Sequence, residues 1–98
     1  MRESTIENHL VQRVKELGGE VRKVKWIGRH GAPDRLVMLP SEYDEPGLYF
    51  PRMPIWVELK APGEKAKPHQ LREHVRMRAM GQQVVVIDSI EGVEGLLS

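Results

Sequence analysis

The chain has 98 residues, 40% of them hydrophobic and 30% charged, which is enough for one domain over residues 1–98 with a modest core, and too little for two. It contains no cysteine, which excludes disulfides, thiolate metal ligands and thiol nucleophiles and is in keeping with a reducing cytoplasm. No apolar run is long enough for a membrane span and no secretory signal opens the chain, so we expect no membrane partner. The net charge is only +1, so we do not expect the chain to bind nucleic acid through an excess of positive charge alone.

The first predicted element is an amphipathic helix over residues 4–17, in which apolar residues recur at helical spacing. Ser4 and Glu7 have the spacing of a capping box, in which each side chain bonds the backbone of the other residue. Gly18 and Gly19 follow, and glycine commonly ends a helix.

Two short strands with a loop between them are expected next. Residues 21–27 alternate well enough for a strand, and residues 35–39 predict a short, mostly buried strand that Pro40 ends. The glycines and the proline of residues 28–33 make that segment a loop by composition.

Residues 40–54 hold four prolines, a glycine and three acids, a composition typical of a loop or a ragged hairpin extension. Residues 55–60 then predict a strand of alternating apolar and polar residues, followed by a turn at residues 62–67.

The last third of the chain predicts a helix, a strand and a weak terminal helix. Pro68 stands at a first helical position, and Gly81 ends the helix that it opens. The apolar run at residues 83–87 indicates a strand buried on both faces, and residues 90–97 indicate the weak helix. A long helix before a buried strand implies a crossover connection, so the expected fold class is α/β, a small mixed sheet flanked by helices.

Three polar residues in this pattern have the chemistry of a metal-dependent phosphodiesterase. Because side chains alternate along a strand, Glu58 and Lys60 share the face opposite the apolar residues, and Asp34 begins the neighbouring strand. Two carboxylates hold Mg²⁺ or Mn²⁺, which polarises a phosphoryl oxygen and supplies a hydroxide near neutral pH. Lys60 would orient the attacking water or stabilise charge developing on phosphorus. The plainer alternative makes Asp34 a turn residue and pairs Glu58 with Lys60 across a solvated sheet surface.

Two further residues are candidates with open alternatives. Glu7 lies in the apolar stripe of the first helix and should point toward the sheet as a third metal ligand, unless it only completes the capping box with Ser4. Glu3, one turn earlier, is the alternative acid. Gln70, in the first turn of the second helix, would bond a substrate phosphate or a metal-bound water, or it is a surface residue.

Basic residues flank the acidic centre along the chain, which suits a polyanion such as DNA, although solvated faces of ordinary helices have similar patterns. The histidines lack the spacing of a metal site. The candidates for DNA binding are Lys25, Arg29, His30, Arg35, Lys65 and Lys67.

These residues occur in an order that resembles one known family. The motifs are Gly31-x-Pro33-Asp34-Arg35, Val57-Glu58-Leu59-Lys60-Ala61-Pro62, Gln70 and Gly81. Together they resemble a stand-alone, phage-type VRR-NUC domain of the PD-(D/E)XK nuclease superfamily, over nearly the whole chain. The resemblance implies a restriction-endonuclease-like αβββαβ core and a Mg²⁺- or Mn²⁺-dependent endonuclease centre.

Carried across residue by residue, the resemblance makes Asp34 and Glu58 metal ligands and Lys60 the catalytic lysine. Gln70 would be the family's helix glutamine, and Glu7, with Glu3 as the alternative, its helix-one acid. Stand-alone members resemble Holliday-junction resolvases that work as homodimers. The resemblance therefore implies branched DNA as the substrate, and the cytoplasm of a bacterial or phage-infected host cell as the location.

Two other functions remain compatible with the sequence. The chain could be a nicking or flap nuclease, or the nuclease subunit of a larger complex. From another class, it could be a DNA-binding module without catalysis, which would bind DNA in a salt-sensitive manner, indifferent to magnesium.

Overall fold

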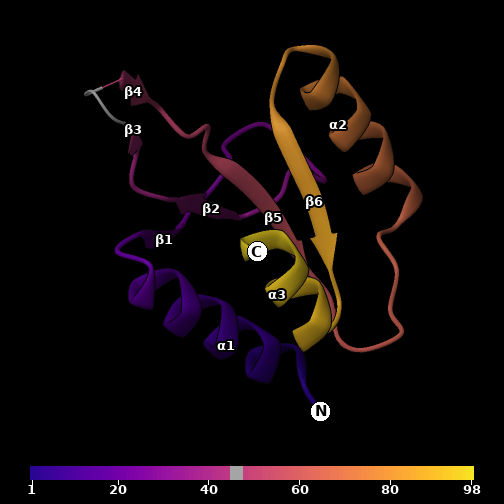
Figure 1. Ribbon diagram of the computed structural model, residues 1–98. Coiled ribbons are helices and arrows are strands. Elements are labelled where there is room, and N and C mark those ends of the chain that lie inside the picture. Colours follow the sequence, from indigo (N-terminus) through magenta and orange to yellow (C-terminus); the bar gives the residue numbers. More distant parts are fainter. Residues whose placement is uncertain (45–47) are drawn as a thin grey trace.

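The computed structural model describes residues 1–44 and 48–98, and its centre is a four-stranded mixed sheet (Figure 1). The strands are β1 (Glu20–Lys23), β2 (Arg35–Met38), β5 (Ile55–Leu59) and β6 (Gln83–Ile87), adjacent in that order. β1, β2 and β5 pair antiparallel, whereas β6 pairs parallel to β5. The expected α/β class and the αβββαβ order of the core are confirmed.

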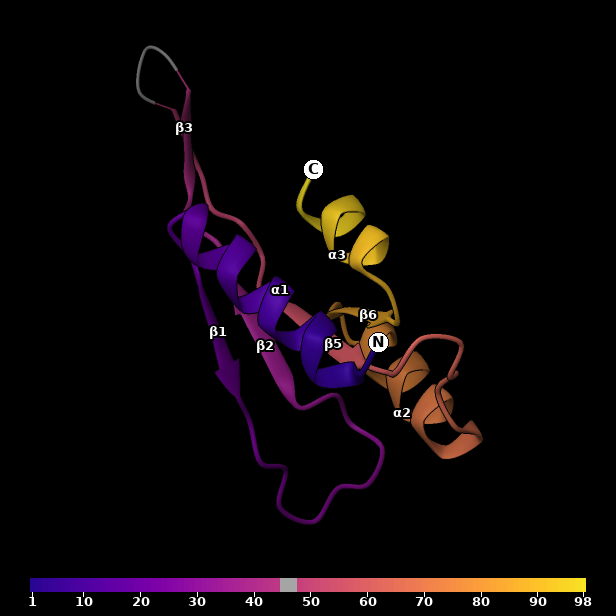
Figure 2. The same cartoon turned by 90° about the horizontal axis from the view of Figure 1, so that it is seen from below.

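Helices cover both faces of this sheet. α1 (Glu3–Glu16) and α3 (Ile90–Leu97) lie side by side over one face, and α2 (Pro68–Ala79) connects the parallel strands β5 and β6 (Figures 1 and 2). α2 packs on the other face of the sheet at β6 and, through its inner side chains, against β5. The predicted crossover is therefore present. No helix within the described residues is long and apolar enough to cross a bilayer.

The apolar core lies between the sheet and the α1–α3 layer. The alternation along β5 directs one set of its side chains into this core, where α1 contributes residues one helical turn apart. Burying each such side chain contributes roughly 1.5–3 kcal/mol. On the surface of this layer, His9 and Arg13 of α1 both contact Glu94 of α3. The core residues are Ile6, Leu10, Val14, Val37, Ile55, Val57, Leu59, Ile87 and Val93.

The ends of the helices follow the sequence signals, with one exception. Pro68 occupies the first turn of α2, and Gly81 beyond its end has a φ of +84°, which favours glycine. The capping box predicted for Ser4 is wrong, because α1 already begins at Glu3 after the extended residue Arg2. Ser4 and Glu7 are therefore both inside the helix.

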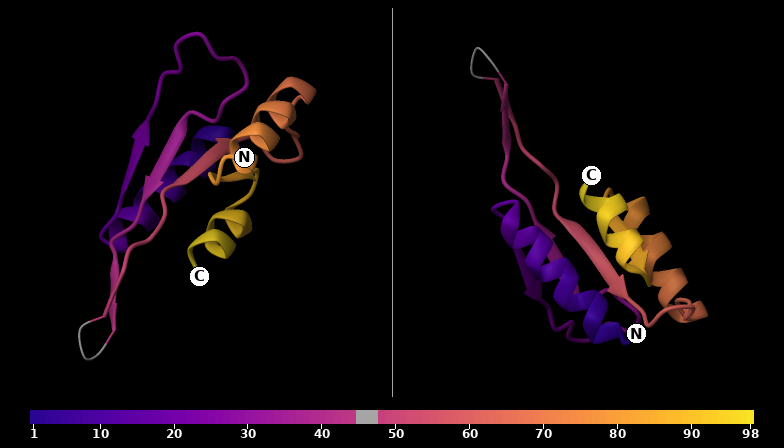
Figure 3. Two further views of the ribbon diagram at one scale, coloured as in Figure 1. Left: turned by 90° about the horizontal axis from the view of Figure 1, so that it is seen from above. Right: turned by 60° about the horizontal axis from the view of Figure 1, so that its bottom comes forward.

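Residues 40–44 and 48–54 extend away from the body of the molecule. β3 (Glu42–Asp44) and β4 (Leu48–Phe50) form an antiparallel pair outside the main sheet, and this hairpin projects beyond the end of α1 (Figures 2 and 3). The predicted hairpin extension is confirmed, although residues 45–47 of that segment lie outside the described residues.

Two strand predictions need correction. β1 ends at Lys23 rather than at residue 27, because the chain then leaves the sheet, and Ile27 is 93% exposed. β6 is not buried on both faces, because the helix on one side covers only part of its length. α2 covers Val84 but leaves Val86 37% exposed, and Val86 is the residue beside Glu58 in the parallel register.

Candidate functional site

The three residues singled out by the sequence converge where β2 begins and β5 ends. Arg35 is paired with Val57 and Leu36 with Trp56, so the next step of this register places Asp34 opposite Glu58. Lys60 lies two residues beyond Glu58 and therefore on the same face of the sheet. The charges of Lys60 and Asp34 both act on the Glu58 carboxyl. The fold thus gathers the three groups on the face that α2 covers.

Glu58 is a buried acid with one oxygen that no described residue hydrogen-bonds. The residue is 8% exposed, and its Oε1 is buried without a hydrogen-bond partner among the described residues. Burial raises the pKa of the Glu58 carboxyl from 4.5 to about 7; the Lys60 ammonium lowers it, whereas the charges of Asp34 and Glu3 raise it further. Because a buried polar atom without a partner is costly, this oxygen is a strong candidate for binding a cation.

His74 on the inner face of α2 lies close to that oxygen. Its Nε2 lies 3.5 Å from Oε1 of Glu58, and its ring is fully buried with neither nitrogen hydrogen-bonded within the described chain. Burial, followed by the charge of Arg78, lowers the pKa of His74, so the ring is neutral at pH 7. The sequence reasoning set this residue aside with the other histidines. No apolar pattern marked it, because the apolar Leu71 and Val75 of α2 are exposed whereas His74 is buried.

The loop that carries Asp34 is fixed at several points. The backbone N–H of Val24 donates to the carbonyl of Asp34 at 2.9 Å, which extends the β1–β2 pairing by one bond. The Trp26 indole donates to the carbonyl of Pro33 at 2.8 Å and packs against Trp56 of β5, with ring centroids 5.1 Å apart. The loop is thereby held at both ends beside the site.

Glycine at position 31 is needed where this loop meets α2. Gly31 has a φ of +84°, and a Cβ there would lie 2.8 Å from the carbonyl oxygen of His69. Any larger residue would push the loop away from the first turn of α2. This close approach sets the position of the loop that ends in Asp34.

Arg35 connects the acids rather than facing solvent. It is 8% exposed, its Nη1 lies 2.8 Å from Oδ1 of Asp34, and its guanidinium also pairs with the carboxylate of Glu7. The sequence named Glu7 as the preferred helix-one acid, and the structure engages it in this ion pair. Glu3, the alternative, is the α1 acid whose charge raises the pKa of Glu58.

The remaining sequence candidates lie around the start of α2 and in the β1–β2 loop. The side-chain carbonyl of Gln70 accepts a hydrogen bond from the backbone N–H of Lys67 at 2.8 Å, which caps the helix. Lys65 and Lys67 are exposed in the segment before α2. Lys25 and Arg29 line a hollow of about 430 Å³ that also contains Asp34.

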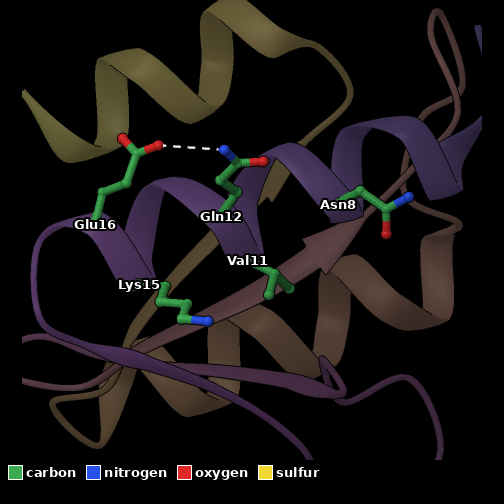
Figure 4. Close-up of a pocket in the computed structure, with 5 residues that line it drawn as sticks. All are labelled: Asn8, Val11, Gln12, Lys15 and Glu16. Carbon is green, nitrogen blue, oxygen red and sulfur yellow. Dashed lines mark hydrogen bonds between the residues drawn. The ribbon is translucent and has the colours of Figure 1, made fainter.

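A larger hollow lies elsewhere, on the outer side of α1. It measures about 580 Å³, and Figure 4 shows its lining, in which the amide of Gln12 is bonded to Glu16. Val11 and Lys15 complete the same side of the helix. This hollow contains none of the candidate site residues. The hollow of about 430 Å³ contains Asp34, Lys25 and Arg29, and the buried Glu58 and Lys60 are not among its lining residues.

The donors at the site suit a hard divalent cation. Asp34 and Glu58 offer carboxylate oxygens, and one oxygen of Glu58 has no hydrogen-bond partner in the described part of the chain. Across residues 1–44 and 48–98, no three histidine, cysteine or acid side chains come close enough together to hold a metal on their own. An ion held here would complete its coordination with water and phosphate oxygens, as Mg²⁺ commonly does.

Comparisons with known proteins bear on the family of the chain rather than on individual site residues. The chain is 51% identical over 89 residues to a protein named "Putative nuclease p44" from Acyrthosiphon pisum secondary endosymbiont phage 1, a match that covers 91% of this chain and 85% of the relative. It is also similar to a solved structure described as "VRR_NUC domain", with a TM-score of 0.75 and 40% identity, covering 97% of this chain and 92% of that one. No family model matches the chain.

Proposed function

Because this chain belongs to the VRR-NUC family of nucleases, we propose that it is a divalent-metal-dependent endonuclease that hydrolyses phosphodiester bonds in DNA. The observation that carries this proposal is the state of Glu58, a buried acid with a partnerless oxygen and a pKa of about 7, opposite a second carboxylate. A fold that maintains such a costly group gains from it only when a cation is bound.

Asp34 and Glu58 would hold the ion, which is Mg²⁺ or Mn²⁺ in this proposal. When bound, the ion would polarise the scissile phosphate and lower the pKa of a bound water. Asp34 would exchange its contact with Arg35 for the ion, while Glu58 would give up the proton that burial favours. Of the two α1 acids, the electrostatic effect of Glu3 on Glu58 favours Glu3 as the third acid, and the ion pair of Glu7 favours a supporting role for Glu7.

Lys60 would act on the phosphate and the attacking water. It is 9% exposed and shares a strand face with Glu58, so its ammonium is held close to the position of the ion. A fixed positive charge there would stabilise the negative charge that develops on the phosphate oxygens. Gln70, at the first turn of α2, would bond a phosphate or a metal-bound water only by releasing its cap on Lys67.

The basic residues around the hollow would bind the DNA backbone. Lys25, Arg29 and His30 lie in the β1–β2 loop that ends in Asp34, and Lys65 and Lys67 lie in the segment between β5 and α2. These groups would contact phosphates without reading sequence. Arg35, buried between two carboxylates, would contribute by holding Asp34 rather than by contacting DNA.

We further propose that the substrate is branched DNA, such as a Holliday junction, and that the enzyme acts as a homodimer in the cytoplasm of a bacterial or phage-infected cell. Symmetric cleavage of a four-way junction requires two equivalent sites, which a twofold dimer supplies. The similarity to a phage protein supports this cellular setting, and β6, as an edge strand, offers backbone groups for pairing with a second copy.

A substrate panel tests the proposal. Labelled four-way junction, flap, single-stranded and duplex DNA would be incubated with the protein in Mg²⁺, Mn²⁺ or EDTA, and light scattering after gel filtration would give the oligomeric state. We expect cleavage of the junction with either metal, none in EDTA, and a dimer. Preferred cleavage of flaps by a monomer would contradict the junction and dimer proposals, and no cleavage of any substrate would contradict nuclease function.

A further inference from the structure

A second cluster of cations lines a hollow between the β1–β2 loop and the side of α2 that carries Arg72, Glu73 and Arg76. The hollow measures about 290 Å³, and it is separate from the one that contains Asp34, although the two share Arg29. Its charged and titratable lining comprises Arg29, His30, His69, Arg72, Glu73 and Arg76.

A buried carboxylate organises this cluster. The side chain of Glu73 is 3% exposed, yet its Oε2 accepts a hydrogen bond from Nε of Arg29 at 3.1 Å. Its Oε1 accepts two from Arg76, from Nε at 3.0 Å and from Nη2 at 2.7 Å. Hydrogen bonds from Arg76 and Arg29 lower the pKa of the Glu73 carboxyl, so it is ionised at neutral pH.

The arginines themselves remain available to a ligand. The side chains of Arg29 and Arg76 are 48% and 53% exposed, and Glu73 occupies mainly their Nε edges. Arg72, one helical turn before Arg76 on α2, is exposed, and no carboxylate partner of it is found within the described residues. Three guanidinium groups against one carboxylate leave an excess of positive charge in a fixed arrangement.

We propose that this cluster binds a phosphate of the DNA backbone at least one nucleotide away from the phosphate that is cleaved. This inference rests on the proposed function. It assigns a phosphate ligand to Arg72 and Arg76, and a positioning role to Glu73, which holds Arg29 and Arg76. Guanidinium groups match phosphate oxygens in planar, paired hydrogen bonds. Because Arg29 borders both hollows, one DNA strand can run from the acidic site to α2 along a continuous basic surface.

The rival explanation is that the cluster only fastens the loop to α2 by ordinary ion pairs. Arg72→Gln separates the two, since Arg72 has no carboxylate partner to lose within residues 1–44 and 48–98. Fluorescence anisotropy of labelled duplex and junction DNA in EDTA would measure binding. At about 0.15 M salt we expect binding weaker by roughly five- to tenfold, and a salt slope smaller by about 1.

Lys15→Gln is the matched control, because it removes the same charge from α1, on the opposite side of the sheet (Figure 4). It should bind DNA as the wild type does. In cleavage assays, the loss in Arg72→Gln should appear in KM for DNA more than in kcat. An Arg72→Gln protein whose affinity and salt slope equal those of Lys15→Gln would overturn the phosphate site.

Glu73→Gln supplies a second, sharper test. This change adds a positive charge to the surface, so simple electrostatic attraction predicts tighter DNA binding. The proposed site predicts weaker binding by roughly threefold or more, because Arg29 and Arg76 lose the carboxylate that positions them. Tighter binding by a variant that retains its melting temperature would overturn the proposal; if Glu73→Gln does not fold, Arg72→Gln decides alone.

Failure of this inference is distinguishable from failure of the proposed function. If the wild-type protein cleaves no DNA with Mg²⁺ or Mn²⁺, nuclease function itself is rejected. If the wild-type protein cleaves and Arg72→Gln behaves as Lys15→Gln does, only the phosphate site is rejected.

Discussion

Glu58 on β5 and Glu73 on α2 are two acids buried on the same side of the sheet, but the protein treats them in opposite ways. Glu73 receives hydrogen bonds from two arginines, which lower its pKa. Glu58 faces a neutral His74 and has an oxygen without a partner, and burial raises its pKa to about 7.

This difference indicates that the charge of Glu73 has a structural role and that the charge of Glu58 has a functional one. The chain supplies the countercharge of Glu73 itself, so that acid stabilises the arrangement of its neighbours. It leaves Glu58 without an adequate countercharge, although a buried carboxylate is costly. We infer that the missing charge arrives with the ion and the substrate, and each prediction below tests this contrast.

The largest effect is expected from Glu58→Gln. Loss of the ligand should reduce Mg²⁺-dependent cleavage by about a thousandfold or more, since metal-ion stabilisation of the transition state is worth several kcal/mol. The metal-free variant should be at least as stable as the wild type at pH 8, because an isosteric neutral group replaces a costly charge. Cleavage rates and thermal unfolding measure the two effects, with the exposed Glu64→Gln as control. Full cleavage by Glu58→Gln would refute the site.

Lys60→Gln should lower kcat by about a hundredfold, in the range typical for a lost proton-transfer or charge-stabilising group. Metal binding should change much less, because Lys60 is not a ligand. Single-turnover cleavage and Mn²⁺ titration calorimetry separate these quantities. If Lys60→Gln instead loses metal affinity but keeps its cleavage rate at saturating metal, Lys60 supports metal binding and the proposed catalytic role is wrong.

His74→Leu should weaken Mn²⁺ binding by about tenfold, as expected when a group that supports a ligand is removed. His74→Gln places an amide near the position of Nε2 and should restore most of the affinity. Calorimetry in the absence of DNA gives a readout that does not depend on cleavage. If both variants lose Mn²⁺ affinity equally, or if their melting temperatures fall in parallel with that affinity, His74 only packs against its neighbours and does not support a metal ligand.

The smallest effect is a pH dependence of stability in the metal-free protein. The pKa of Glu58 is about 7 in the folded state, compared with its ordinary value of 4.5, which we take for the unfolded chain. Between pH 4.5 and 7 the carboxyl is therefore protonated in the folded protein but ionised in the unfolded chain. The free energy of unfolding should therefore fall as pH rises through this window, by about 1–2 kcal/mol after allowing for partial solvation. Urea unfolding from pH 4 to pH 8 measures this decrease, which Glu58→Gln should lack.

Glu73 contributes with the opposite sign. Because Arg76 and Arg29 lower its pKa, its stabilising effect is present above its ordinary value of 4.5 and is lost as pH falls below it. A metal-free stability profile of Glu58→Gln that still falls between pH 4.5 and 7 would show that some other group causes the loss.

Much of the site was predictable from the sequence because it depends on local geometry. Alternation along β5 places Glu58 and Lys60 on one face, and an antiparallel neighbour beginning at Asp34 brings the second carboxylate opposite. The helices and strands also followed from periodicity and from signals such as Pro68 and Gly81.

The parts that escaped prediction depend on tertiary packing. The inner face of α2 carries Glu73 and His74, whereas the apolar Leu71 and Val75 of the same helix are 48% and 62% exposed. Hydrophobic periodicity therefore points to the wrong face of α2. The exposure of Val86 likewise follows from the partial cover of β6 by α2, which no local pattern encodes.

The most direct test of the account is anomalous scattering from crystals soaked in Mn²⁺. We predict one strong peak within coordination distance of a carboxylate oxygen of Asp34 and of Oε1 of Glu58. A Mn²⁺ ion bound elsewhere, with Glu58 still facing only His74, would contradict the claim that this acid is kept buried in order to bind a metal ion.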